Sequence, residues 1–135
     1  MKAYMFGNKI PQSITSLIAR GSHIAGDICF SGGLRIDGEV TGDIRTNSEH
    51  VGLLVLADSA QVIGTVLADH IIINGTVKGS VFALHLLELQ PKARIEGDVH
   101  YAALEMHQGA LIIGMLQPLL ENEENLQLSL KANSR

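Results

Sequence analysis

The residues of this 135-residue sequence that could most readily catalyse a reaction or bind a metal are six histidines, one cysteine and three aspartates that follow glycines. The histidines are His23, His50, His70, His85, His100 and His107. A helical zinc site would place two histidines four positions apart, and a structural zinc site would add clustered cysteines. Neither pattern occurs, so we interpret the histidines as isolated surface residues and expect no metal or other cofactor.

The cysteine and the aspartates also point away from catalysis. Cys29 lies beside Phe30, and we expect its thiol to be packed rather than nucleophilic. The aspartates that directly follow a glycine are Asp27, Asp43 and Asp98. Calcium-binding solenoids carry a Gly-Gly-x-Gly-x-Asp nonapeptide that is missing here, so these carboxylates are expected to bond to turn backbone. We therefore predict no catalytic, cofactor-binding or metal residue, and a protein that is not an enzyme.

Two stretches of the chain are copies of one unit. Residues 87–99 read LELQPKARIEGDV and residues 104–116 read LEMHQGALIIGML, so the copies start 17 positions apart. A repeat of this length is about one circuit of a β-solenoid. The segment 34–44, LRIDGEVTGDI, recurs in the same way as 71–81, IIINGTVKGSV.

The repeat predicts an all-β fold. Apolar residues alternate with period two, which places them on one face of short strands, and glycines recur where the chain must bend. Copies begin near residues 16, 34, 54, 71, 87 and 104, giving about six circuits of roughly 15 to 20 residues with three strands each. Stacked about 4.8 Å apart, they would form a body about 3 nm long. We predict a right-handed parallel β-helix because parallel crossovers prefer that hand; a left-handed coil is the alternative.

Composition excludes several function classes. Apolar residues make up 46% of the chain, charged residues 18% and aromatic residues 4%, so the core must consist of aliphatic side chains. The formal net charge of -4 argues against a nucleic-acid partner, which would need a basic face. The single cysteine forbids an internal disulfide, and we find neither a secretory signal nor a spanning segment, which favours a cytoplasmic protein.

The chain divides into an N-terminal tail (1–13), a β-helix (14–118) and a polar C-terminal tail (119–135), both tails being expected to lack order. Residues 45–52 interrupt the repeat and predict a longer loop. Apolar and cationic residues in the first tail would suit a weak membrane-binding peptide whose many copies act together on a polymer. These residues are Lys2, Tyr4, Met5, Phe6 and Lys9.

Residues 33–44, 73–81 and 93–99 resemble the bactofilin family of bacterial polymer-forming cytoskeletal proteins, and the similarity extends over about 14–118. The resemblance implies a right-handed β-helix that assembles end to end into nonpolar filaments without a nucleotide. It also implies membrane association, through a peptide such as 1–13, at the inner face of the cell membrane. Cell shape or localised cell-wall synthesis would be the process served, with cell-wall enzymes or membrane proteins as further partners. Several relatives use an aromatic residue near the C-terminal end for subunit contact, but this chain has no Phe after Phe82.

The residues themselves also favour self-assembly. A solenoid needs polar caps on its terminal repeats to remain soluble alone, yet both end circuits of this chain are apolar. The same end of a second copy is the simplest cover, and such isologous contacts give a filament without polarity. We expect the polymer interface to contain Ile14, Leu17, Ile18, Leu111, Ile113, Met115 and Leu116.

Two other function classes stay open on the sequence. One is a left-handed β-helix acyltransferase of the hexapeptide type, which would form trimers and use His70 or His85 between subunits. The other is a passive scaffold that binds a wall enzyme without polymerising.

Overall fold

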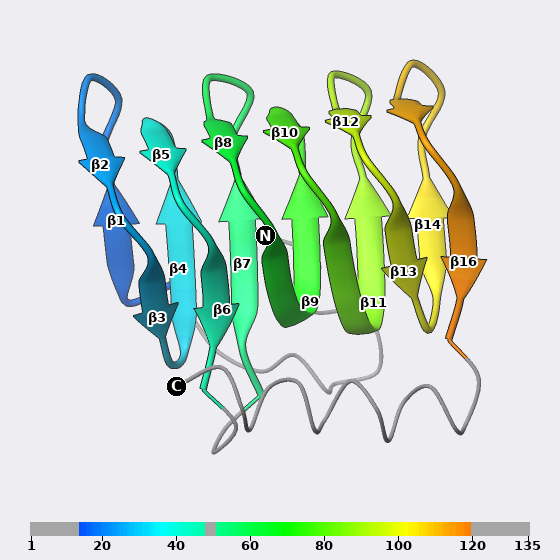
Figure 1. Ribbon diagram of the computed structural model, residues 1–135, viewed down its shortest axis with the longest axis horizontal. Coiled ribbons are helices and arrows are strands. Elements are labelled where there is room, and N and C mark those ends of the chain that lie inside the picture. The colour runs from blue at the N-terminus through cyan, green and yellow to red at the C-terminus, as the bar shows by residue number, and fades with distance from the viewer. Residues whose placement is uncertain (1–13, 48–50, 120–135) are drawn as a thin grey trace.

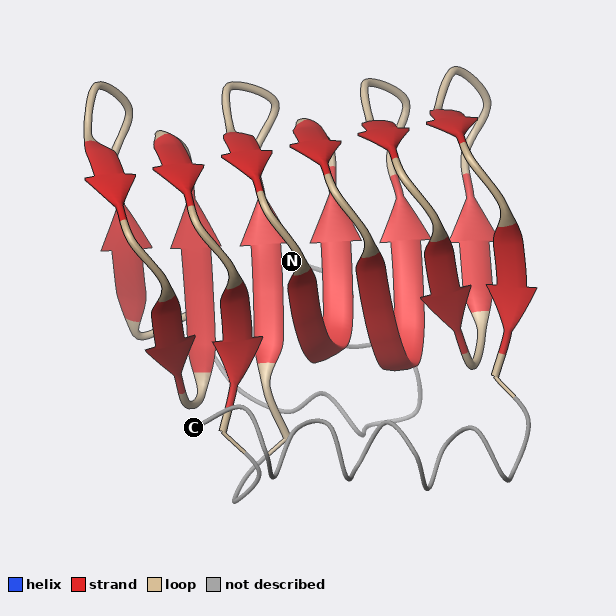
Figure 2. Ribbon diagram, viewed as in Figure 1, coloured by secondary structure: helices blue, strands red, loops and turns tan. Residues whose placement is uncertain are grey.

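The computed structural model describes residues 14–47 and 51–119, which form strands and no helix (Figure 2). The chain rises along the far strands and descends along the near ones as it advances from circuit to circuit (Figure 1), which makes the coil right-handed. The predicted right-handed parallel β-helix is therefore confirmed, and the left-handed alternative is wrong.

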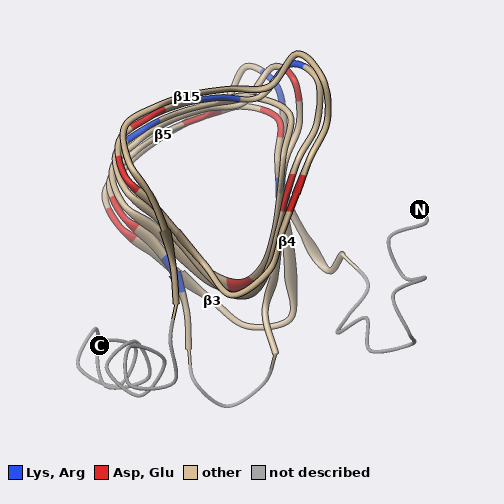
Figure 3. Ribbon diagram, turned by 90° about the vertical axis from the view of Figure 1, so that its right-hand side faces the viewer, with Lys and Arg blue, Asp and Glu red and all other residues tan. Residues whose placement is uncertain are grey.

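The coil is triangular in cross-section (Figure 3) and each circuit contributes one strand segment to each of three faces. Face 1 contains β1 (Ser16–Ile18), β4 (Gly33–Ile36), β7 (Leu53–Leu56), the later parts of β9 (Val66–Ile73) and β11 (Val81–Leu89), and β14 (Leu104–Met106). Face 2 contains β2 (His23–Ala25), β5 (Glu39–Thr41), β8 (Gln61–Ile63), β10 (Thr76–Lys78), β12 (Arg94–Glu96) and β15 (Leu111–Ile113). Face 3 contains β3 (Ile28–Phe30), β6 (Ile44–Thr46), the early parts of β9 and β11, β13 (Val99–Tyr101) and β16 (Leu116–Pro118).

Strand registers define six circuits, numbered 1 to 6 along the chain. Leu87 pairs with Leu104, which confirms the 17-residue repeat. Leu34 pairs with Leu54, and Leu54 with Ile71, so the two similar segments lie two circuits apart. The longest step, 34 to 54, contains the interruption expected at residues 45–52, although residues 48–50 themselves lie outside the described part.

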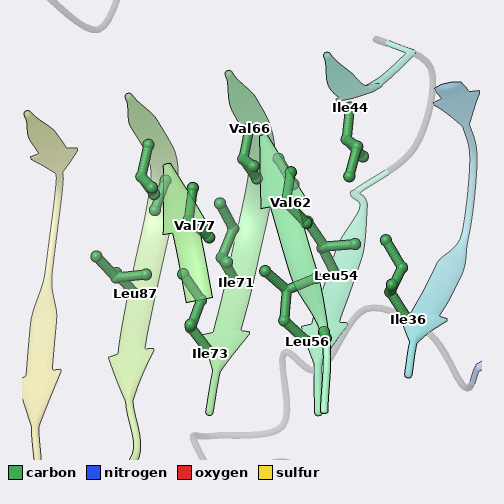
Figure 4. Close-up of a cluster of buried hydrophobic side chains, with 14 of the residues drawn as sticks. Ile36, Ile44, Leu54, Leu56, Val62, Val66, Ile71, Ile73, Val77 and Leu87 are labelled. Atoms are coloured by element: carbon green, nitrogen blue, oxygen red, sulfur yellow. The ribbon is translucent and has the colours of Figure 1, made fainter. Parts of the chain in front are cut away.

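The core consists almost entirely of aliphatic side chains stacked in columns, as the low aromatic content predicts, with Phe30 as the aromatic member of the buried cluster. On face 2, Val40, Val62, Val77 and Ile95 are successive partners, and each is almost fully buried. Figure 4 shows such side chains pointing inward from neighbouring circuits. At about 25 cal/mol per Å² of apolar surface buried, this repeated stacking is the main force that holds the circuits together.

Glycines form a second column at the corner between faces 2 and 3. Gly64 and Gly79 occupy neighbouring circuits with φ of 149° and 155°, a backbone conformation that residues with a side chain rarely adopt. A Cβ at Gly79 would lie 2.1 Å from the carbonyl oxygen of Gly64. The corner thus requires glycine for both conformation and space, which explains why the Ile-x-Gly-x-Val pattern recurs.

Candidate polymer interface

The histidines are distributed around the coil and do not converge on one site. His23 Nε2 lies 3.0 Å from Thr41 Oγ1, and His107 Nε2 lies 3.2 Å from Glu88 Oε2. His100 stacks on Phe82 with ring centroids 4.3 Å apart. His50 lies outside the described residues.

His70 and His85, the two candidates for an acyltransferase base, stack on each other within one subunit at a centroid distance of 5.6 Å. Burial lowers the pKa of His70, and the neighbouring His85 lowers it further, against a smaller opposing effect of Asp69. In residues 14–47 and 51–119, no group of three or more His, Cys, Asp or Glu residues could hold a metal ion.

The three aspartates that follow a glycine bond to backbone, as expected from the sequence. Asp27 Oδ1 accepts from the backbone N–H of Asp43 at 2.8 Å, and Asp43 Oδ1 accepts from Thr65 N–H at 2.9 Å. Asp98 Oδ1 accepts from Met115 N–H at 3.1 Å. Each carboxylate thus ties its circuit to the next one.

Cys29 corrects one expectation. Its side chain is exposed, whereas the neighbouring Phe30 is buried. The two residues are adjacent in β3 and therefore project to opposite sides of the strand. The thiol is outside the core because the inward position of this strand belongs to Phe30.

Both ends of the coil have open strand edges. In circuit 1, β1, β2 and β3 each pair on one side only, with β4, β5 and β6. In circuit 6, β14, β15 and β16 pair only with strands of circuit 5. Among the described residues no further strand covers either set, so six short edges remain available for pairing.

At the N-terminal end, the expected interface residues differ in orientation. Ile18 pairs with the buried Ile36 and is half-buried against the core, so it faces inward and contributes to the end surface. Leu17 pairs with the exposed Arg35 and is 58% exposed on the outside of face 1. Ile14 precedes β1 and is exposed.

The four expected residues at the C-terminal end also divide into two groups. Leu116 pairs with the buried Val99, so its side chain faces inward, but no later circuit covers it and it is 45% exposed. Leu111 and Ile113 pair with Arg94 and Glu96, whose side chains project outward. At this end the expected interface therefore contains one inward residue, Leu116, and two outward residues, Leu111 and Ile113. Met115 lies between β15 and β16 and is 62% exposed.

Several inward residues at the ends were absent from the predicted interface, and three of them lie at the ends of core columns or are strongly exposed. Ile24 occupies the first position of the column that continues with Val40, and Ile112 occupies its last. Met106 pairs with the buried Leu89 and is exposed. Aligning all six copies would have shown which apolar residue of each end circuit continues a core column.

A family model described as "Bactofilin: Polymer-forming cytoskeletal" matches residues 16–117, from the first strand of the coil almost to the last. The chain belongs to the bactofilin family. The resemblance noted in residues 33–44, 73–81 and 93–99 is thereby confirmed. The family is structural and cytoskeletal, and its members form polymers.

Among solved structures, the cytoskeletal bactofilin BacA, determined by solid-state NMR, matches with a TM-score of 0.69 and 27% sequence identity. The match covers 81% of this chain and all of that chain. No curated protein matches the sequence. The described residues include no helix that could span a membrane.

Proposed function

We propose that this bactofilin assembles end to end into nonpolar, nucleotide-independent filaments at the inner face of the cell membrane. N-terminal ends join N-terminal ends, and C-terminal ends join C-terminal ends. The filaments support cell shape or localised cell-wall synthesis by holding wall enzymes or membrane proteins along the membrane.

The observation that carries the proposal is the position of the exposed apolar side chains. Of ten large hydrophobic residues exposed in the described part, only Val51 and Ile63 belong neither to circuit 6 nor to the N-terminal end. The same two ends carry the open strand edges. Joining ends would satisfy backbone hydrogen bonds and bury apolar surface in one step.

Membrane attachment is assigned to the first tail, whose five candidate residues lie outside the described part. Lys2 and Lys9 would meet anionic lipid while Tyr4, Met5 and Phe6 enter the interface. One copy binds weakly, so attachment depends on the polymer.

Negative-stain microscopy of the purified protein without nucleotide tests assembly. Long filaments are expected, whereas particles that stay single at high concentration would refute the proposal. A lipid pelleting assay tests the tail. Removal of residues 1–10 should reduce pelleting with anionic vesicles and leave filaments intact, and equal pelleting would refute the membrane role.

Disulfide formation between subunits can test whether the filament is polar, because Cys29 and Gln117 are the first and last residues of one outward column. In a polar stack, position 117 would lie about 4.8 Å from Cys29 of the next subunit. Gln117→Cys in a Cys29→Ser background, mixed with the unmodified protein and oxidised, should then form mixed disulfides. The nonpolar arrangement predicts none.

A further inference from the structure

The outside of circuit 6 on face 2 is unlike the outside of any earlier circuit. Leu111 and Ile113 project outward and are 43% and 50% exposed. The earlier members of their two columns are polar apart from Ala25 and Ile63. These earlier members are His23, Glu39, Gln61, Thr76 and Arg94 in one column and Ala25, Thr41, Ile63, Lys78 and Glu96 in the other.

An end-to-end stack that buried only the inward residues would leave this outer pair in water. The backbone of β15 indicates what covers it. Leu111 N donates to Ala93 O at 2.9 Å, and Gly97 N donates to Ile113 O at 3.0 Å, so these two residues bond toward circuit 5. Because backbone groups alternate along a strand, the N–H and C=O of Ile112 face the open edge.

A single residue that presents both a donor and an acceptor is self-complementary about a two-fold axis. In antiparallel pairs, two opposed residues can exchange both N–H···O bonds, and the flanking pairs then bring their side chains closest. Ile112 can therefore pair with Ile112 of a second copy. Leu111 then lies opposite Ile113 of that copy, and Ile113 lies opposite its Leu111.

We propose that β15 pairs antiparallel with β15 of a second copy, centred on Ile112, and that Leu111 and Ile113 form two cross-strand apolar pairs on the outside of this joint. The inference rests on the proposed nonpolar filament and specifies the register of its C-terminal joint. It gives Leu111 and Ile113 a role that they would not have if only the inward residues of the two ends were stacked.

The same two-fold axis, normal to face 2, exchanges faces 1 and 3 between the two copies. Strand β14 then runs antiparallel to β16 of the second copy, and Met106 lies opposite Leu116. These are the two inward large residues of circuit 6 that are most exposed, each at 45%.

Head-to-tail stacking matches this surface less well. Continuing the columns into the next subunit would place Leu111 against His23 and Met115 against Asp27, while Ile112 would meet Ile24. The inward residues fit either arrangement. Leu111 finds an apolar partner only in the antiparallel joint, and Ile113 meets Leu111 there, whereas in the head-to-tail stack it would meet the smaller Ala25.

Charged side chains introduced at positions 111 and 113 test the proposed register. Leu111→Lys alone and Ile113→Glu alone should each raise the concentration for half-maximal filament pelleting about tenfold, since each variant loses two apolar cross-strand pairs per joint. The double variant Leu111→Lys/Ile113→Glu places an amine opposite a carboxylate twice and should return to within about threefold of the unmodified protein. The control Leu111→Lys/Ile113→Lys changes the same positions with like charges and should assemble worst.

Equal pelleting of the two double variants would overturn the register, while filaments of the unmodified protein would still uphold the proposed function. Failure of the unmodified protein to form filaments would instead reject that function.

Disulfide trapping gives a second measurement that does not depend on filament strength. Leu111→Cys and Ile113→Cys, each in a Cys29→Ser background, should form a mixed disulfide dimer on oxidation, because directly opposed residues lie within bridging distance. Neither variant alone should form a disulfide dimer, because the same position in the second copy is a diagonal neighbour roughly 8 Å away. A disulfide between Leu111→Cys and His23→Cys variants instead would establish a polar stack and overturn the inference.

Discussion

The two ends of the coil share an open circuit of three strands but differ in the side chains around it. The N-terminal end exposes three large apolar residues, Ile14, Leu17 and Ile24. The C-terminal end exposes five, Met106, Leu111, Ile113, Met115 and Leu116. If buried apolar area drives joining, the C-terminal joint should be the stronger, and assembly should proceed through C-terminal dimers that then link into filaments.

The largest effect is expected from Leu116→Arg. The substitution would bury two unpaired guanidinium groups in each C-terminal joint, at a cost of several kcal/mol. Filaments should disappear from pelleting assays and micrographs while far-UV circular dichroism keeps its β-signal. Gln117→Arg is the matched control, because Gln117 projects outward from the same strand, and it should preserve filaments. Filaments unchanged by Leu116→Arg would contradict a C-terminal joint.

Arginine at the two ends of one column compares the joints directly. Ile24→Arg should block the N-terminal joint and leave C-terminal dimers, whereas Ile112→Arg should leave N-terminal dimers. Because the C-terminal end is the more apolar, the dimers of Ile24→Arg should dissociate at a concentration about tenfold lower or more. Analytical ultracentrifugation over a dilution series measures the dissociation of both dimers. Tighter dimers of Ile112→Arg than of Ile24→Arg would refute the stronger C-terminal joint.

Much of this molecule could be predicted from sequence because its repeat dictates its fold. The spacing of Ile, Gly and Val established the circuits, their number and the corner glycines without reference to any contact. Orientation at the ends was harder. Leu111, Ile112 and Ile113 are three consecutive apolar residues, so composition alone does not show that Ile112 faces inward. The register with Arg94, Ile95 and Glu96 decides it.

The family match and the positions of the residues support different conclusions about the C-terminal end. The family match supplies polymer formation, but the aromatic contact expected from relatives has no Phe at the C-terminal end of this chain. Met106 and Leu116 occupy the inward end positions instead. Flexible side chains can fill such a joint without the fixed shape of a ring, so the proposed contact is argued from column positions and not from residue type.

The glycine column gives a smaller contrast between the ends. A Cβ at Gly114 would lie 2.1 Å from the Gly97 carbonyl oxygen, whereas a Cβ at Gly26 would meet nothing within 4 Å. Both have positive φ, 154° and 137°. Gly26→Ala should therefore cost only backbone strain, about 1–3 kcal/mol, and Gly114→Ala more. Urea denaturation in a Leu116→Arg background, where assembly is blocked, measures this, and equal losses would show that the carbonyl contact is relieved.

The smallest expected effect is a pH dependence of stability that arises in the middle of the coil and not at its ends. Burial, followed by His85, lowers the pKa of His70 in circuit 4. The unfolded chain therefore takes up this proton at a higher pH than the folded protein, so the free energy of unfolding should fall as the pH drops below about 6.5. His70→Gln should flatten that slope, and His85→Gln should reduce it only in part, because burial is the larger cause. Urea midpoints measured between pH 7.5 and 5, again with assembly blocked, test this order. A slope that His85→Gln removes completely would show that the second histidine, and not burial, controls the response of the coil to acid.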